Sequence, residues 1–188
     1  MEKHKEFNLD YLKKIMLRNK KIKIKYTIQK CNFGFVFIAI CDLGIISIQF
    51  SDFKEFFEEK IKNLNHNKVI ENLENADQHE WSKEILNYLE NPTRNFTLPI
   101  FVEGTFFQKK VWQALKQIPT GKTQSYKKIA EQIGLPKSVR AVANACATNP
   151  IAFVIPCHRI IRSNGALSDY RWGKERKRQM LEFEKALL

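Results

Sequence analysis

The sequence contains no apolar run long enough to cross a membrane. Its 188 residues include no stretch of about 18 consecutive apolar side chains, which is close to the shortest that spans a bilayer as a helix. The first residues mix both charge signs and lead into no apolar stretch, so we expect no secretory signal. These absences exclude a membrane-spanning protein and favour a cytoplasmic one.

Cysteine is sparse, and its spacing lacks the pairs that are typical of metal sites. The four cysteines are Cys31, Cys41, Cys146 and Cys157. None belongs to a C-x-x-C pair, so we expect no bound metal ion. A reducing cytosol also disfavours disulfides. The first three lie in or beside apolar or small-residue segments, and we interpret them as structural.

Acidic side chains are few in the second half of the sequence. Residues 104–188 carry 16 basic and 5 acidic residues, a net charge of +11, whereas residues 52–91 carry 5 basic and 10 acidic residues, a net charge of −5. In a chain of net charge +12, such a basic half indicates a polyanionic partner, and nucleic acid is the usual one. A merely solvated basic surface would give the same composition.

The first half predicts a small sheet with helices. Residues 22–29 alternate between apolar and polar side chains, which is the period of a half-buried strand. Turn residues separate this segment from two more apolar segments, which favours an antiparallel meander. The expected strands are 22–29, 33–40 and 43–50, the expected helices are 52–63 and 78–90, and 64–77 is expected to be a loop or a poor helix. Residues 1–21 form either a short helix or a loose arm.

The second half predicts a mostly helical domain. Residues 92–104 read as an extended linker that separates it from the first half. Thr105 and Gln108 then form a capping-box pattern ahead of an apolar stripe. A last helix is expected over 174–187.

Two short helices in this half are typical of a helix-turn-helix. Ser125 is positioned to cap the first, which ends near Ile133. Pro136 is expected to open the second, which runs to about Ala147. The second helix is rich in small side chains, and composition alone fits either tight core packing or close approach to a DNA groove.

A cysteine, a histidine and an arginine follow an apolar run near the C-terminal end. The run 151–155 reads as a short buried strand that Pro156 ends, because proline cannot donate to a ladder. Cys157 therefore lies beside cationic neighbours that can favour a thiolate. A buried structural cysteine is the alternative interpretation.

At this point the sequence resembles the O6-alkylguanine-DNA alkyltransferases, also called methylated-DNA–protein-cysteine methyltransferases. The resemblance spans about 104–184 and includes 104–108, 111–112, 118–119, 125–126, 140–142, 149–150 and 156–159. Many separated blocks in one order are more specific than a single short motif. Residues 166–168 and 170–173 are most similar to the catalytic half of the bacterial Ada protein. The regulatory four-cysteine zinc site of that protein has no counterpart here, so transcriptional activation is not expected.

The resemblance implies a fold and an activity. It implies an α+β protein with a ribonuclease-H-like antiparallel sheet and helices over 1–98, followed by a mostly helical, winged-helix-like, helix-turn-helix domain over 99–188. The activity would be DNA repair by direct reversal. An alkyl group would move irreversibly from O6 of guanine, less well from O4 of thymine, to Cys157, without a cofactor.

The resemblance also implies roles for individual residues. His158 would take the thiol proton through a water, Glu184 would orient the imidazole, and Tyr126 would donate a proton to the departing guanine. Arg140 would fill the space left by the flipped base. The other implied residues are Asn149 as a hinge, Lys177 as a support of the site, Ile160, Tyr170 and Arg171 at the base, and Ser125, Lys137, Ala141 and Ala145 at the DNA minor groove. The expected partner is alkylated double-stranded DNA, bound by a monomer.

Two residues depart from the family pattern at the lip of the expected pocket. Asp169 stands where Ada-like members have glycine, which would strain the loop if positive φ were required there. Trp172 stands where many relatives have glycine. Three other functions remain as alternatives: a non-catalytic lesion binder, a helix-turn-helix regulator, and a cysteine hydrolase.

Overall fold

The computed structural model describes residues 9–18, 22–64, 70–73 and 79–186. The chain divides into two compact units, one covering residues 5–102 and the other containing residues 103–188. The sequence-based boundary lay after residue 98. Together they make a mixed α+β protein with a four-stranded sheet and, over the described residues, seven α-helices.

The first unit is built on a mostly antiparallel sheet. Strands β1 (Ile24–Cys31), β2 (Gly34–Cys41) and β3 (Gly44–Ser51) form the predicted meander, in which β1 and β3 each pair antiparallel with β2. The sheet order is β3-β2-β1-β4, because β4 (Ile70–Asn72) pairs parallel with β1. The prediction of a loop or helix is wrong at β4. A three-residue strand is too short to show a periodicity in sequence.

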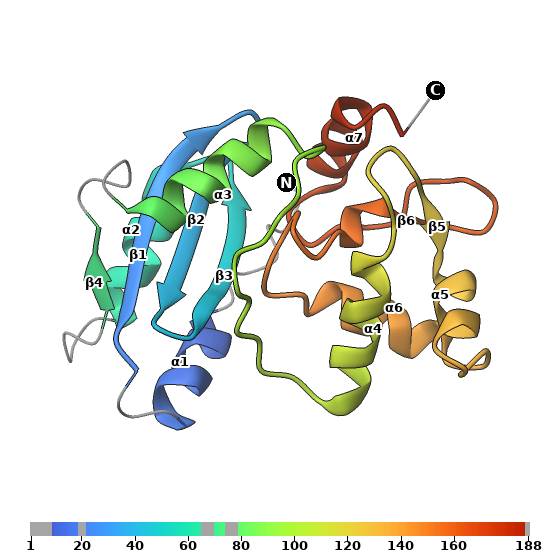
Figure 1. The fold of residues 1–188 in the computed structure, drawn as a ribbon, viewed down its shortest axis with the longest axis horizontal. Coiled ribbons are helices and arrows are strands. Elements are labelled where there is room, and N and C mark those ends of the chain that lie inside the picture. The colour runs from blue at the N-terminus through green and yellow to red at the C-terminus, as the bar shows by residue number, and fades with distance from the viewer. Residues whose placement is uncertain (1–8, 19–21, 65–69, 74–78, 187–188) are drawn as a thin grey trace. The chain divides into compact units, whose positions relative to one another are not determined.

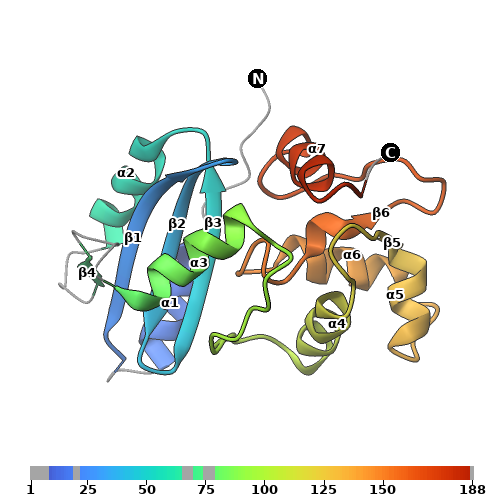
Figure 2. The ribbon, with the colours of Figure 1, turned by 45° about the horizontal axis from the view of Figure 1, so that its top comes forward.

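Helices cover both faces of this sheet. The core on one face joins α1 (Leu9–Arg18), α2 (Lys54–Leu64) and the inward side chains of β2, among them Phe37 and Ala39. On the front of the sheet lies α3 (Glu80–Glu90), which crosses the strands in both ribbon views (Figures 1 and 2). Of the two interpretations for the N-terminal segment, the helix is the correct one over the described residues.

The second unit is mostly helical, as expected. Its helices are α4 (Phe106–Lys116), α5 (Tyr126–Gln132), α6 (Val139–Ala147) and α7 (Lys174–Phe183). The Thr105–Gln108 capping box is confirmed in both directions, and Ser125 caps α5 by accepting from the Lys128 amide. The expected start of α6 at Pro136 is wrong, since a turn occupies residues 136–137 and the helix begins at Val139. None of the helices in the described ranges is long and apolar enough to span a bilayer.

A pair of two-residue strands links two distant segments of the second unit beside Cys157 and His158. The strand β5 (Gln124–Ser125) pairs parallel with β6 (Ile160–Ile161), and the short 3-10 helix η3 (Cys157–Arg159) leads directly into β6. This pairing brings the start of α5 alongside the residues that follow Cys157. Sequence periodicity could not reveal it, because neither strand is long enough to alternate.

The apolar run before Cys157 is a buried turn, and the prediction of a strand is wrong. Residues 152–154 form turns, and the Ile155 amide donates to the Ile151 carbonyl. Side-chain hydrogen bonds from Asn149 satisfy backbone groups that a strand would have paired in a ladder. Phe153 has a φ of 68°, which is uncommon for a residue with a β-carbon. The run is apolar because it is buried on all sides.

Candidate active site

The Cys157 thiol is buried and is held by a neighbouring amide. Its side chain lies at the start of η3, where the residue is 4% exposed. The Asn149 side-chain amide donates one hydrogen bond to the sulfur over 3.1 Å and another to the Ile155 carbonyl over 2.8 Å. The Asn149 oxygen accepts from the Ile151 amide at 2.9 Å. Asn149 therefore fixes both the turn and the thiol that follows it, which agrees with the expected hinge.

The His158 imidazole lies between an aromatic ring and a carboxylate. It stacks on Phe153, with ring centroids 5.0 Å apart and an interplanar angle of 9°. Its Nε2 lies 3.0 Å from Oε1 of Glu184, the residue that directly follows α7. The buried Nδ1 of His158 has no hydrogen-bond partner among the described residues. The left-handed backbone at Phe153 thus positions the ring that sets the plane of the imidazole.

Arg159 neutralises Glu184. Its guanidinium donates to both carboxylate oxygens, from Nε over 2.9 Å and from Nη2 over 2.8 Å. It also donates to the Ile118 carbonyl and to the Thr120 hydroxyl, which anchors it to the segment that follows α4. From the sequence, Arg159 was expected only as a cationic neighbour of the Cys157 thiol, and its pairing with Glu184 was not predicted. Its place directly after the Cys-His pair was the available signal.

These contacts decide the charge states. Burial by itself raises the pKa of Glu184, but hydrogen bonds from His158 and Arg159 outweigh it and lower the pKa to about 2. Burial lowers the pKa of His158 despite the Glu184 hydrogen bond, and Arg159 already balances the carboxylate charge. We therefore assign a neutral imidazole whose Nε2–H donates to Glu184. The lone pair on Nδ1 is then available as a base.

The resting sulfur is a thiol. Burial raises the pKa of Cys157, and the Asn149 hydrogen bond and the Lys177 charge offset this only in part. The charge of Lys177 acts in the direction that favours a thiolate, but desolvation is the larger effect. Proton removal must accompany the reaction, which requires a base close by.

Tyr126, Ser168 and Lys177 form a second hydrogen-bonded cluster. The Tyr126 hydroxyl lies 2.8 Å from Oγ of Ser168, and the Lys177 ammonium donates to the same Oγ over 2.7 Å and to the Ile160 carbonyl. Lys177 is 0% exposed, although its place on the last helix could equally have faced solvent. The structure thus brings three predicted residues together through Ser168, which sequence analysis did not single out.

Aromatic and cationic side chains follow in the loop before α7. The rings of Tyr170 and Trp172 meet edge to face, with centroids 5.1 Å apart, and both residues are buried. The Arg171 guanidinium lies 5.7 Å from the centroid of the Trp172 ring. Burial raises the pKa of Tyr170, and a hydrogen bond with Cys157 is a further cause. Asp169 is exposed and is not among the described residues with positive φ, so the anticipated backbone strain is absent there.

The helix-turn-helix exposes some of the predicted DNA-binding residues and buries one. Lys137, Arg140 and Ala141 are exposed at the start of α6. Ala145 is 2% exposed, and its carbonyl accepts from the Trp112 indole, so its assignment to the DNA surface is wrong. The helical period turns Ala145 inward with Val142. Ser125 is half-buried and caps α5.

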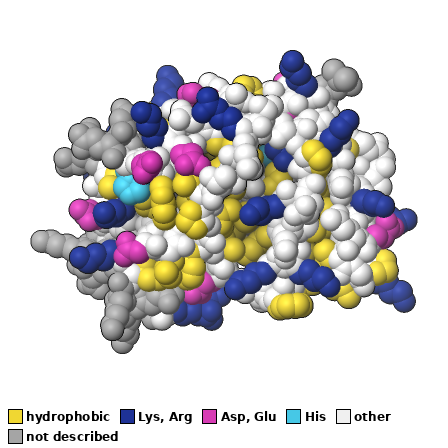
Figure 3. All heavy atoms as spheres, in the orientation of Figure 1, with side chains coloured by type: hydrophobic (Ala, Val, Ile, Leu, Met, Phe, Trp, Pro, Cys, Tyr) yellow, Lys and Arg dark blue, Asp and Glu magenta, His cyan; other side chains and the backbone are white. Residues whose placement is uncertain are grey.

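Surface charge differs between the two units. Figure 3 shows acidic and basic side chains together over the unit that contains β1–β4, and mainly Lys and Arg over the unit that contains α4–α7. The basic surface therefore lies on the same unit as the buried thiol.

In the described part of the chain, no group of three or more His, Cys, Asp or Glu residues is placed to hold a metal ion.

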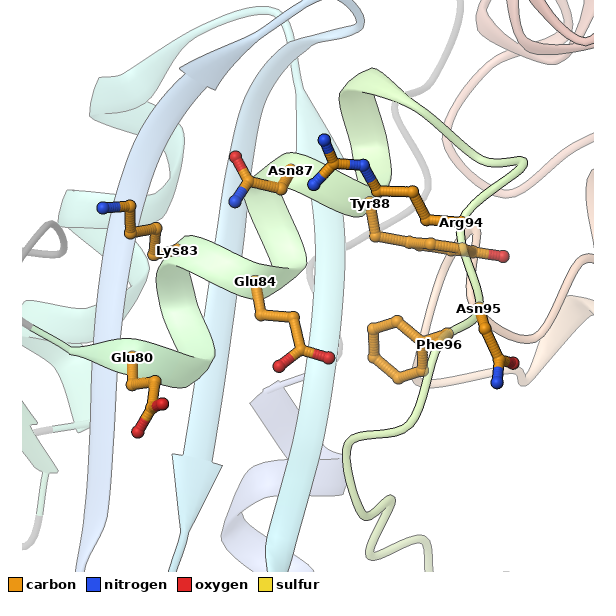
Figure 4. Close-up of a pocket in the computed structure, with 8 residues that line it drawn as sticks. All are labelled: Glu80, Lys83, Glu84, Asn87, Tyr88, Arg94, Asn95 and Phe96. Atoms are coloured by element: carbon orange, nitrogen blue, oxygen red, sulfur yellow. The ribbon is translucent and has the colours of Figure 1, made fainter.

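The first unit has a groove of its own, of about 280 Å³, along α3. Figure 4 shows Tyr88 and Phe96 side by side at one end of it, with ring centroids 4.9 Å apart, and Glu80, Lys83 and Glu84 along the helix. Its lining contains no cysteine and no histidine. A second hollow of the same unit, of about 520 Å³, is lined by Cys41 and His79 among others. All the residues that the sequence predicted to carry the chemistry belong to the second unit.

Comparisons with known proteins agree with this geometry. A family profile described as "6-O-methylguanine DNA methyltransferase, DNA binding domain" matches residues 106–186. The inducible methylated-DNA–protein-cysteine methyltransferase of Bacillus subtilis is 40% identical over 143 residues, which cover 76% of this chain and 79% of that protein. The bifunctional transcriptional activator/DNA repair enzyme Ada of Escherichia coli is 38% identical over 87% of this chain. The chain spans 46% of the length of Ada.

Solved structures are similar over both units. The crystal structure of the Mycobacterium tuberculosis O6-methylguanine methyltransferase superposes with a TM-score of 0.71 at 31% identity, covering 87% of this chain and 93% of that one. The structure of the same organism's OGT in complex with DNA has a TM-score of 0.71 at 31% identity, covering 86% of this chain and 93% of that one.

Proposed function

Because this chain belongs to the methylated-DNA–protein-cysteine methyltransferase family, we propose that it repairs DNA by moving an alkyl group from O6 of guanine onto Cys157. The observation that carries this proposal is the paired arrangement of a buried thiol held by Asn149 and a neutral imidazole held by Glu184. O4-alkylthymine is proposed as a poorer substrate. A thioether has no easy route back to a thiol, so each molecule acts once and needs no cofactor.

The thiol proton would leave through His158. The Nδ1 atom of its neutral imidazole is the available acceptor, and a bridging water completes the path from the sulfur, as we propose. The imidazolium that forms gains an ion pair with Glu184, whose charge Arg159 holds in place. The thiolate then attacks the alkyl carbon, to which a soft sulfur nucleophile is well matched.

The guanine would leave with a proton from Tyr126. The bond from the alkyl carbon to O6 breaks and its electron pair stays on the purine, which therefore needs a hydrogen-bond donor. The Tyr126 hydroxyl is bound to a buried cationic cluster, which supports this role. The backbone near Ile160 and Arg171, and the Tyr170 ring, are proposed to bind the base edges.

The lesion would reach the thiol by base flipping, because a stacked base cannot contact a buried sulfur. Arg140 is exposed at the start of α6 and is proposed to fill the space that the base leaves. Lys137, Ala141 and Ser125 are proposed to line the minor groove around it. Contacts of this kind depend on backbone charge and DNA deformability, which suits a protein that must find damage in any sequence.

We also propose the domain types, the cellular location and the oligomeric state of the protein. We assign residues 1–98 to a ribonuclease-H-like domain and residues 99–188 to a winged-helix-like DNA-binding and alkyl-acceptor domain. The protein is proposed to act as a cytoplasmic monomer on alkylated duplex DNA. Size-exclusion chromatography coupled to light scattering, with and without duplex DNA, tests the monomer.

Peptide mass spectrometry after mixing with duplex DNA that carries O6-methylguanine tests the activity. One added methyl group per protein, on the peptide that contains Cys157, is the expected result. Cys157→Ala abolishes the gain, whereas Cys31→Ala, which changes a half-buried cysteine of the first unit, preserves it. Lesion binding without any mass gain would mean a non-catalytic lesion binder, and turnover of a small ester would mean a cysteine hydrolase.

A further inference from the structure

Ser168 lies between two residues of the site, Tyr126 and Lys177, and forms a hydrogen bond with each. Its Oγ lies 2.8 Å from the Tyr126 hydroxyl on α5 and 2.7 Å from the Lys177 ammonium on α7. A longer contact of 3.4 Å joins the same oxygen to the Ile160 carbonyl. Ser168 is 6% exposed and Lys177 is 0% exposed, so water screens these contacts little.

The donors in this cluster have a fixed direction. An ammonium group has only protons to give, so Lys177 occupies one lone pair of the Ser168 oxygen. The single Ser168 proton then goes to Tyr126 at 2.8 Å or to the Ile160 carbonyl at 3.4 Å. At 3.4 Å the contact with the carbonyl is long for a hydroxyl donor. We therefore assign the Ser168 proton to the shorter contact with Tyr126, which directs the Tyr126 proton away from Ser168.

We propose that Ser168 is a positioning residue that aligns Tyr126 as a proton donor and couples it to the buried Lys177 ammonium during alkyl transfer. This inference rests on the proposed function and deepens it. Ser168 itself touches neither the sulfur nor the alkyl carbon in this role. It acts through the orientation and polarisation of the Tyr126 hydroxyl.

The protons balance along this path. As the sulfur–carbon bond forms and the carbon–O6 bond breaks, the electron pair remains on the purine and Tyr126 gives its proton to the purine ring. Ser168 passes its proton to the Tyr126 oxygen, and Lys177 passes one to Ser168. The sum is one proton from Lys177 to guanine, while the thiol proton goes separately to His158. No oxidant, reductant or further reactant is needed.

The acidities support such a path. Burial raises the pKa of Tyr126, so the phenol alone is a weak proton donor at neutral pH. Burial lowers the pKa of Lys177 to about 8, which makes its ammonium a better acid than a solvated lysine. The titratable or charged groups that act on Lys177 from the elements packed around it are Cys157, Cys146, Asp169 and Lys174, together with His158 and Tyr126.

The first test is the single-turnover rate of Cys157 methylation at saturating lesion DNA. Ser168→Ala is expected to lower this rate by roughly 10- to 100-fold, within the range of general acid catalysis, without changing affinity for the lesion. Ser168→Thr keeps the hydroxyl and is expected to restore most of the rate. The matched control is Ser163→Ala, an exposed serine of the same loop, which leaves the rate unchanged. An unchanged rate in Ser168→Ala overturns the inference.

The pH profile separates positioning from mere structural support. The folded pKa of Lys177 is lowered to about 8. The ammonium is therefore still present at neutral pH, but it is lost as pH rises through about 8 and not near the ordinary value of 10.5. The wild-type rate should therefore fall above pH 8. In Ser168→Ala the rate should be low throughout and lack this fall. A variant profile that is parallel to that of the wild type contradicts the coupling.

A double-mutant cycle with Tyr126→Phe covers the case in which Ser168→Ala folds poorly. If Ser168 acts through Tyr126, adding Ser168→Ala or Ser168→Thr to Tyr126→Phe changes the rate less than about twofold. An equal loss in both backgrounds overturns the inference. A wild-type protein that never methylates Cys157 refutes the proposed function instead, so the two failures are distinguishable.

Discussion

The two units bury different kinds of polar side chain. In the described part of the first unit the buried polar residues are uncharged, and they are Thr27, Ser47, Gln49 and Ser82. Three of them pair with a neighbour two positions away, since Gln49 donates to Ser47 over 2.8 Å and Thr27 accepts from Gln29 over 2.9 Å. The second unit buries the ionisable residues His158, Arg159, Arg176, Lys177 and Glu184. Arg176 donates to the Trp172 carbonyl four positions away, and the other four have partners 9 to 41 positions away.

This difference separates a scaffold from a reactive site. Burial of a charge costs several kcal/mol per ion unless partners compensate it, so a unit selected only for stability has little reason to bury five ionisable groups. Strongly perturbed pKa values therefore tend to gather where chemistry occurs. The net charge follows the same division, because the basic surface that suits DNA lies on the unit that buries the thiol.

The largest expected effect is the loss of rate on replacing His158, for which His79 of the first unit is the matched comparison. His158→Ala should slow methyl transfer by ~10²–10⁴-fold, because it removes the base for the thiol proton. His79→Ala changes a residue of the first unit whose buried Nδ1 also lacks a partner within the described chain, and it should leave the rate unchanged. Quench-flow measurement of Cys157 methylation compares them. Equal losses of rate in the two variants would mean that a buried imidazole with an unpaired Nδ1 affects only stability, in either unit.

The next effect concerns stability. Glu184→Gln leaves Arg159 buried without a counter-charge, and we expect a loss of about 3–5 kcal/mol in the free energy of unfolding. Glu84→Gln, on α3 of the first unit, removes only the negative charge of a surface side chain that accepts from the Thr97 hydroxyl over 3.3 Å, and it should cost less than about 0.5 kcal/mol. Urea unfolding of both variants measures the contrast, and similar midpoints would contradict it.

Lowering the pH should reveal how much the Glu184 carboxylate contributes to stability. The folded pKa of Glu184 lies near 2, below the ordinary value of 4.5, so its contribution is present above pH 4.5 and is lost as pH falls through 2. A shift of this size corresponds to about 3 kcal/mol. The wild type should lose stability steeply between these values, and Glu184→Gln less so. Parallel pH curves for the two proteins would exclude a depressed Glu184 pKa.

A smaller loss is expected for Asn149→Ala. It leaves the Ile151 amide unpaired in the interior and removes one of the two hydrogen bonds to the Ile155 carbonyl, at a cost of about 2–3 kcal/mol in all. Gln49→Ala removes a buried amide from the first unit and should cost about 1 kcal/mol, because the hydrogen bond to the Ser47 hydroxyl on the same strand is lost. Thermal unfolding by circular dichroism ranks them, and the reverse order would contradict the hinge role of Asn149.

The smallest expected effect is a loss of DNA affinity, and it compares the surface of the second unit with that of the first. Arg140→Ala should weaken binding to lesion-containing duplex by about tenfold, equal to about 1.4 kcal/mol. Arg94→Ala, an exposed arginine of the first unit, should leave it unchanged. Fluorescence anisotropy at two salt concentrations measures both. Equal weakening by the two variants would indicate that net charge alone drives binding.

Local rules predicted most of the elements. The strand predicted from the alternation over 22–29, the capping box at Thr105 and the cap at Ser125 each depend on neighbours within four residues, and all three are present. The predicted alternation of burial is not, since Thr27 is buried and Tyr26 and Ile28 are half-buried. Elements that depend on distant partners were missed. The short strands β4, β5 and β6 exist because a remote strand pairs with them, so their own sequence carries no periodicity.

Sequence by itself determined which residues are proposed to carry the chemistry of this protein, because a thiol, an imidazole, a carboxylate and a phenol stand in blocks that resemble one family. Tertiary structure alone decided their states and partners. It turned Ala145 inward, bound Glu184 to Arg159 across 25 positions, and brought Ser168 between Tyr126 and Lys177. The physical reason is that desolvation and long-range hydrogen bonds set protonation, and both exist only after the chain has packed.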